Sequence, residues 1–379
     1  MTSSSLDALR SAWHRITKGY RSFFGIYVYA VTWRYLILRM TRSVFWKQRT
    51  PLTNRYLVAL PAYASEGIGG QFVKWNTARL LSRKHGLIFV HHPFTPSSHS
   101  PGLDWEGFLG FGVGEIEYSS LATRSDMHVV DLPPLHITAV GAFFGKASMP
   151  ADFLSLTLGQ VLAPEPVLFR LGPDTWMDAQ AHELEELRRK YRVARSTEMT
   201  IDHNPLTAVV TVAVHIRRGD VRTLKEIGSD EGNRRWIDEV YYAKLCNGIN
   251  GVLGVGNVEI RVYSDDIPES FEILPSISNV HFRIYEGAPV DADIAFNEMV
   301  SADVLVIGMS SFSYLAALLS EGVKLVPYPY AHEVPSDWIN CGAAGSFDAQ
   351  QLSALMEGRL QDKSRPSRAA EAAIEVSRE

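Results

Sequence analysis

Two adjacent arginines follow the most apolar run of the chain. Residues 207–216 are all Ala, Val, Ile or Thr except His215, and the next residues are Arg217, Arg218, Gly219 and Asp220. A guanidinium group is permanently charged and presents its N–H donors in a planar fork that suits phosphate or carboxylate. Two such groups at one place predict an anionic ligand. The alternative interpretation is a solvated strand end with no ligand.

Two further polar clusters follow apolar runs. Asp265 and Asp266 come directly after residues 258–264, and a serine-rich stretch comes after residues 304–308, namely Ser310, Ser311 and Ser313. Hydroxyl groups and free amides at the start of a helix bind phosphate oxygens. Together with the arginines, these residues predict a diphosphate site that needs no metal ion.

A glycine-rich turn lies near the beginning of the chain. It contains Glu66, Gly67, Gly69 and Gly70, and it separates an apolar run from a helical pattern. Glycines at a strand-to-helix junction allow a ligand to approach the backbone closely. The turn lacks the full dinucleotide-binding spacing and has no Walker lysine, so the pattern by itself identifies no particular ligand.

Strands and helices must bring these clusters together. The sequence pattern predicts helices at 176–195, 238–253, 293–301 and 312–321, and a polar loop at 221–235. It predicts strands at 55–61, 87–92, 127–132, 207–216, 258–264, 280–284, 304–308 and 323–327, with the last closing the sheet. Strands alternating with helices are typical of doubly wound parallel α/β sheets, which bind ligands beyond the carboxyl ends of their strands.

Composition restricts the class of protein. The 379 residues are 46% hydrophobic and 21% charged, which is typical of a soluble globular protein with room for two domains. The net charge of −5 argues against nucleic acid as a partner. The only cysteines are Cys246 and Cys341, which predicts no disulfide framework, no zinc site and a reducing, cytoplasmic compartment.

Residues 1–50 differ from the rest of the chain. They contain nine Lys or Arg residues, one acidic residue and many aromatic residues. This composition suits a helix lying at the inner surface of a membrane, and equally a helix packed on the protein body. We expect an N-terminal α/β domain at 51–200, a nucleotide-binding domain at 201–362 and a charged tail at 363–379.

Three of the C-terminal motifs, taken together, resemble the fucosyltransferase superfamily. They are VHIRRGD at 214–220, YSDD at 263–266 and ADVLVIGMSSFSYLAALL at 302–319, and the first-half segment EGIGGQF at 66–72 is similar to the opening glycine loop of that superfamily. The resemblance covers about residues 55–330. It implies a GT-B-like fold, in which two Rossmann-like domains face each other, and an acceptor that is a glycan or polysaccharide.

The resemblance also implies roles for the motif residues. GDP-fucose would be a co-substrate, with no cofactor and no metal, and Arg217 and Arg218 would stabilise the departing GDP. His215 would lie near the nucleoside, Asp293 would bind guanine, and either Glu66 or Glu226 would be the general base of an inverting transfer. In this interpretation Asp220, Asp265, the three serines and the three glycines complete the donor site.

Several alternative interpretations apply to the same residues. Asp291 and Asp293 form an Asp-x-Asp pair like that of metal-dependent transferases, but acidic residues are also common at helix starts. Ser310 after a glycine faintly resembles a hydrolase nucleophile turn, with His332 as the available histidine. The aromatic stretch at 105–112 suits a sugar site, a lid or a packing insert. A nucleotide-sugar-binding protein without turnover is the remaining rival.

Overall fold

The computed structural model describes most of the chain. The described residues are 54–61, 66–97, 100, 102–132, 166–172, 179–196, 209–266, 268–284 and 292–364. The basic segment 1–50 and nearly all of the tail from 363 lie outside the described residues. No helix in the described part of the chain is long and apolar enough to cross a membrane.

Two compact units divide the chain. Unit 1 comprises the described residues within Met1–Ala62, Lys74–His92 and Gly114–Met177. Unit 2 comprises those within Tyr63–Val73, Pro93–Val113 and Asp178–Glu379. The glycine turn and the aromatic stretch therefore belong to the same unit as the arginine pair and the serine cluster.

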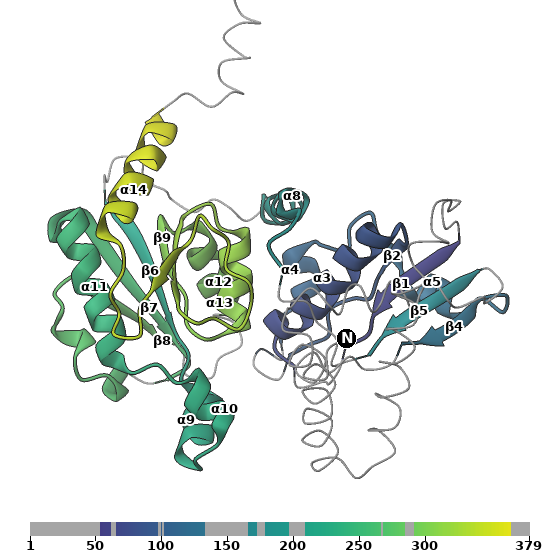
Figure 1. The fold of residues 1–379 in the computed structure, drawn as a ribbon, viewed down its shortest axis with the longest axis horizontal. Coiled ribbons are helices and arrows are strands. Elements are labelled where there is room, and N and C mark those ends of the chain that lie inside the picture. The colour runs from purple at the N-terminus through teal and green to yellow at the C-terminus, as the bar shows by residue number, and fades with distance from the viewer. Residues whose placement is uncertain are drawn as a thin grey trace, which may run out of the picture. The chain divides into compact units, whose positions relative to one another are not determined.

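The sheet of unit 1 has five parallel strands in the order β3-β2-β1-β5-β4 (Figure 1). Their bounds are β1 Arg55–Ala59, β2 Ile88–His91, β3 Ile116–Glu117, β4 His128–Asp131 and β5 Val167–Leu171. Helix α3 (Ile68–His85) begins in unit 2 and continues in unit 1, where Ala78 and Leu81 pack on one face of the sheet. Helix α5 (Tyr118–Ala122) contributes Leu121 to the other face.

The sheet of unit 2 has six parallel strands in the order β11-β10-β9-β6-β7-β8. Their bounds are β6 Val210–Ile216, β7 Val258–Ser264, β8 Val280–Ile284, β9 Val304–Val306, β10 Val323–Pro327 and β11 Ile339–Cys341. The central strand β6 is rich in β-branched residues and buried on both faces, as a strand between two helical layers must be.

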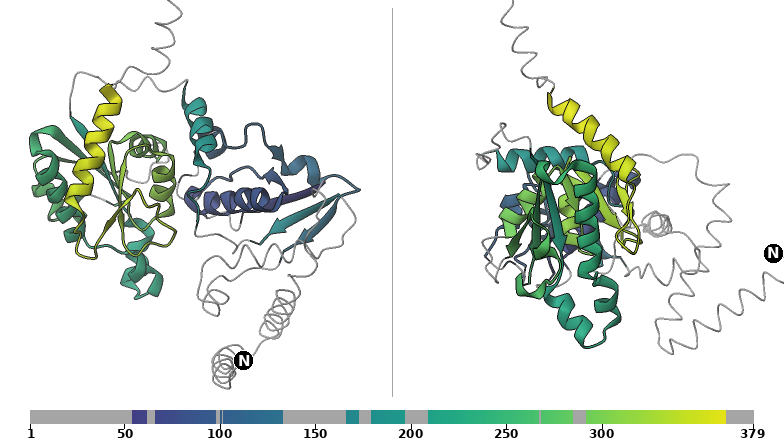
Figure 2. Two further views of the ribbon diagram at one scale, coloured as in Figure 1. Left: turned by 45° about the horizontal axis from the view of Figure 1, so that its top comes forward. Right: turned by 90° about the vertical axis from the view of Figure 1, so that its left-hand side faces the viewer.

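Helices cover both faces of this second sheet (Figure 2). The helices of unit 2 after the start of α3 are α4 Trp105–Leu109, α8 Leu184–Arg195, α9 Gly219–Glu226, α10 Asp230–Arg235, α11 Glu239–Leu253, α12 Ala292–Ser301, α13 Ser311–Leu319 and α14 Ala349–Ser364. Three short 3-10 turns are η1 Val255–Asn257, η2 Pro268–Ser270 and η3 Leu274–Ser276. Helices α11 and α14 pack on one face, and α12 and α13 pack on the other (Figure 1).

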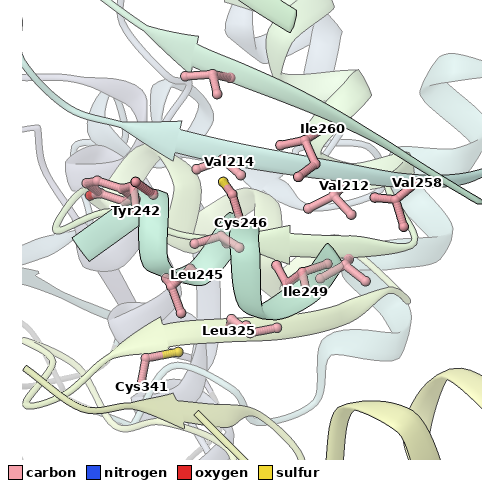
Figure 3. Close-up of a cluster of buried hydrophobic side chains, with 14 of the residues drawn as sticks. Val212, Val214, Tyr242, Leu245, Cys246, Ile249, Val258, Ile260, Leu325 and Cys341 are labelled. Atoms are coloured by element: carbon pink, nitrogen blue, oxygen red, sulfur yellow. The ribbon is translucent and has the colours of Figure 1, made fainter. Parts of the chain in front are cut away.

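The main core of unit 2 lies between α11 and the sheet (Figure 3). Cys246 and Ile249 project from α11 toward Val214 and Val212 of β6, and Leu245 points toward Leu325 of β10. Residues at this spacing occupy one side of a helix, and alternate residues of a strand occupy one side of a sheet. Both Cys246 and Cys341 are buried free thiols.

The structure confirms the predicted α/β class with parallel sheets. Two all-parallel sheets with interleaved helices fit the predicted GT-B-like fold. Two predictions were wrong. Residues 221–235 form α9 and α10 rather than a polar loop, and the strand at 323–327 does not close the sheet, because β11 pairs beyond it.

Candidate functional site

The strand order of unit 2 determines where a ligand would bind. From β6 the chain continues to β7 and β8 on one side, and then returns to β9, β10 and β11 on the other side. The order therefore reverses between β6 and β9, and open α/β sheets bind ligands beyond the carboxyl ends of the two strands at such a switch point. Arg217 follows β6, and Gly308 to Ser310 follow β9.

Arg217 contacts the serine turn across this switch point. Its Nη1 donates to Ser310 Oγ over 3.4 Å. The carboxylate of Asp220 accepts from the same guanidinium. Arg217 Nη2 donates to Oδ1 at 2.8 Å and to Oδ2 at 2.9 Å, and Nε donates to Oδ1 at 3.1 Å. The side chain of Arg217 is 18% exposed. One preorganised cation is therefore placed where β6 and β9 separate.

The side chain of Arg218 contacts Trp236 rather than the serine turn. Its guanidinium lies 4.0 Å from the ring of Trp236, and Nη1 donates to the carbonyl of Arg217 over 3.2 Å. Burial is the main cause that lowers the pKa of this residue, which is 2% exposed. The guanidinium of Arg217 is therefore directed at the serine turn, and that of Arg218 at Trp236.

Asp265 acts on the backbone rather than at the switch point. Its Oδ1 accepts the amide of Arg218 over 2.7 Å, at the start of α9. A Cβ at Gly219 would lie 2.8 Å from the carboxylate carbon of Asp265, so glycine is needed for this close approach. Asp220 therefore holds the side chain of Arg217, and Asp265 holds the backbone amide of Arg218.

His215 presents a buried imidazole on the same face as Arg217. The residue is 9% exposed and its ring packs against Phe312, with 5.8 Å between ring centroids. Burial, together with the charge of Arg217, lowers its pKa to about 3, so the ring is neutral at pH 7. Its Nδ1 has no hydrogen-bond partner in the described part of the chain. A buried orphan of this kind suits contact with a ligand.

The three serines of the turn have different environments. Ser310 is the N-cap of α13, and its Oγ accepts the amide of Phe312 over 3.3 Å. Ser311 is half-buried at the first position of the helix. Ser313 is fully buried, and its hydroxyl donates to the carbonyl of Ser310 over 3.3 Å. Ser310 and Ser311 therefore lie at the switch point, whereas Ser313 stabilises the turn from inside.

The glycine turn contacts the serine turn directly. A Cβ at Gly69 would collide with the carbonyl group of Ser311 and would lie 2.5 Å from the nitrogen of Phe312. Gly67 O accepts the amides of Gly70 at 2.9 Å and Gln71 at 3.1 Å, where α3 begins. The starts of α3 and α13 are therefore in contact, and both present the positive ends of their helix dipoles.

Glu66 lies at this same junction. A Cβ at Gly70 would be 2.7 Å from Glu66 Oε1, so the missing side chain leaves room for the carboxylate. The buried amide of Gln71 holds the backbone of this turn, donating to Glu66 O at 2.9 Å and to Thr95 O at 3.0 Å. Spacing in the sequence gave no indication that Gln71 has this role.

Glu226 and Asp293 lie at opposite ends of two different helices of unit 2, the last turn of α9 and the first turn of α12. Glu226 is the exposed last residue of α9, about 10 Å along the helix from the end that follows Arg217. Asp293 is half-buried in the first turn of α12, and its Oδ1 accepts the amide of Ile294 over 2.9 Å. Asp291 lies outside the described residues. Among those described, no group of three His, Cys, Asp or Glu side chains could hold a metal ion.

The aromatic stretch packs inside unit 2. Trp105 and Phe108 are 2% and 4% exposed, and each makes an edge contact with Phe296 of α12. Asp104 caps α4, accepting the amide of Gly107, and Glu106 accepts the amide of Phe94 over 3.0 Å. Of the three interpretations left open by the sequence, these contacts favour the packing insert.

Comparisons with known proteins found similar solved structures. No family model and no curated protein matches the chain. The chain is similar to POFUT1 in complex with GDP-fucose, with 15% identity and a TM-score of 0.44, covering 73% of this chain and 97% of that chain. It is also similar to the α-1,6-fucosyltransferase NodZ co-crystallised with GDP, with 12% identity and a TM-score of 0.38, covering 70% of this chain and 92% of that chain.

Proposed function

We propose that this protein is an inverting, metal-independent glycosyltransferase that moves L-fucose from GDP-fucose to a hydroxyl group of a glycan. The contact between Arg217 and Ser310 across the β6–β9 switch point carries the proposal. It joins a permanent cation to a helix start at the place where this class of sheet binds ligands. The choice of GDP-fucose rests on the motif resemblance described above.

The proposed donor site uses the contacts of the switch point. Arg217 and the amide end of α13 bind the diphosphate, and Asp220 keeps the guanidinium in place. The neutral ring of His215 contacts the nucleoside side of the donor, and Asp293 accepts from guanine. Arg218 does not contact phosphate in this proposal, because its guanidinium is stacked on Trp236. It instead holds the residues that follow β6 in place.

The transfer step then follows. The acceptor oxygen bonds to the anomeric carbon as the bond from that carbon to the β-phosphate oxygen breaks, and the bonding electron pair leaves with GDP. Arg217 stabilises the charge that develops on the leaving group. Glu66 takes the acceptor proton, because it lies at the glycine turn that contacts α13, whereas Glu226 lies at the far end of α9.

Replacing each candidate base by glutamine shows which of the two, Glu66 or Glu226, takes the acceptor proton. Glu66→Gln is expected to lower kcat for fucose transfer about 100-fold or more, the usual contribution of a general base. Glu226→Gln, the same change at an exposed helix end, should leave kcat within about twofold. Initial rates with saturating GDP-fucose give both values. Equal losses in the two variants, or a loss confined to Glu226→Gln, would remove Glu66 from the role.

A panel of nucleotide sugars tests the function itself. GDP-fucose, GDP-mannose and UDP-glucose are compared by thermal shift and by release of free nucleotide, with and without EDTA. We expect the largest shift and nucleotide release with GDP-fucose, unaffected by EDTA. Binding of GDP-fucose without any release, even with a range of glycan acceptors, would instead support the non-catalytic binding protein. No shift with any GDP-sugar contradicts the proposal.

A further inference from the structure

A tyrosine beyond the next strand contacts the backbone of the serine turn. Tyr330 follows β10, which lies beside β9, and its hydroxyl lies 3.2 Å from Gly308 O and 3.1 Å from Ser310 O. These are two carbonyl oxygens of the turn that joins β9 to α13. Burial raises the pKa of Tyr330 above its ordinary value, so the hydroxyl remains a neutral donor.

These contacts determine where the amides of the turn point. In a trans peptide the C=O and N–H bonds point in opposite directions. The carbonyls of Gly308 and Ser310 point to Tyr330, so the N–H groups of Met309 and Ser311 point away from it. Within the described part of the chain, neither of these two amides donates to a protein acceptor.

The other two amides of the turn already donate hydrogen bonds to acceptors within the turn. Ser310 N donates to Gly308 O over 2.8 Å, and Phe312 N donates to Ser310 Oγ over 3.3 Å. The amides of Met309 and Ser311 are thus the donors that remain for an anion, beside the guanidinium of Arg217 that already reaches Ser310. Backbone amides left without a protein acceptor in a turn of this kind bind phosphate oxygens.

Tyr330 is itself held rigidly. Its ring packs against Tyr314 of α13, with centroids 5.5 Å apart, and Tyr314 in turn stacks on His332 at 4.7 Å. The contact with the ring of Tyr314 therefore gives the Tyr330 hydroxyl a defined position against the turn. The hydroxyl of Tyr314 donates to the carbonyl of Glu333 over 3.0 Å.

We propose that Tyr330 is a positioning residue that orients the amides of Met309 and Ser311 toward the diphosphate of the nucleotide. It acts through the backbone and does not touch the ligand. This inference rests on the proposed function for the identity of the ligand, but the support that Tyr330 gives to the turn can be measured without any ligand.

The test compares Tyr330→Phe with Tyr314→Phe. Each variant loses one hydroxyl and keeps its ring, but only Tyr330→Phe loses the contacts with the serine turn. Calorimetric titration with GDP, guanosine and inorganic pyrophosphate gives the affinities. We expect Tyr330→Phe to weaken GDP and pyrophosphate about fivefold to tenfold while guanosine changes less than twofold, and Tyr314→Phe to bind all three like the wild type.

Hydrogen exchange of the ligand-free protein provides the second readout. A peptide covering residues 308–314 should exchange faster in Tyr330→Phe than in the wild type, because the carbonyls that accept from Ser310 N and Tyr314 N lose their support. Unchanged exchange, or an equal loss of affinity for guanosine and GDP, overturns the inference. If the wild type binds neither GDP nor pyrophosphate, the proposed function fails, and the exchange measurement alone then decides the role of Tyr330.

Discussion

Arg217→Lys is expected to lower kcat/KM for GDP-fucose by about 100-fold or more, with little change in the free energy of unfolding. The guanidinium of Arg217 reaches Ser310 Oγ while two of its nitrogens are held by Asp220. A lysine ammonium is a single point charge and cannot make both contacts in a fixed plane. Removing one preorganised donor to a developing oxyanion costs about 3 kcal/mol of transition-state stabilisation.

Arg218→Lys is the matched control, because it makes the same change one residue further along. Its guanidinium lies over the ring of Trp236, which follows α10. Loss of that stacking costs about 1 kcal/mol of stability, and we expect kcat/KM to fall less than tenfold. Steady-state kinetics and urea unfolding of both variants separate the two roles. If Arg218→Lys loses as much activity as Arg217→Lys, both arginines bind the diphosphate and our assignment of Arg218 is wrong.

Gly69→Ala is expected to lower the free energy of unfolding by about 3 kcal/mol and to weaken nucleotide binding in parallel. The new methyl group would meet the carbonyl of Ser311 and the nitrogen of Phe312, which are backbone atoms of a helix start and cannot move aside as a side chain can. Overpacking against rigid atoms costs up to about 3 kcal/mol. The starts of α3 and α13 would have to separate.

Gly251→Ala is the control for this substitution. Gly251 lies in α11, and a Cβ there meets no atom within 4 Å. Replacing glycine by alanine in an exposed helix position stabilises the helix by about 1 kcal/mol, so the same change should act in the opposite direction. Urea unfolding and GDP titration of both variants provide the comparison. Wild-type stability and GDP affinity in Gly69→Ala would show that the two helix starts do not need their close contact.

Local patterns predicted eight of the eleven strands that the structure describes, and missed β3, β5 and β11. The run that forms β6 is apolar and β-branched, which identifies a strand buried on both faces, and the polar residues after β6, β7 and β9 were placed at strand ends for that reason. The helices α9 and α10 were missed because their sequence is polar, with a glycine inside α10. They are stabilised as a pair, where Gly232 packs on the backbone of Leu224 and Lys225.

By itself, the sequence determined that this chain forms parallel α/β sheets with charged and serine-rich strand ends. Those features depend on side-chain type and on spacing along the chain. Only the tertiary structure decided which strand ends are neighbours, and so which polar groups meet. The pairing of β6 with β9 brings Arg217 to Ser310, the packing of α9 against α10 brings Arg218 to Trp236, and the return of the chain after β10 places Tyr330 against the turn. These contacts join residues far apart in sequence, and no local pattern contains that information.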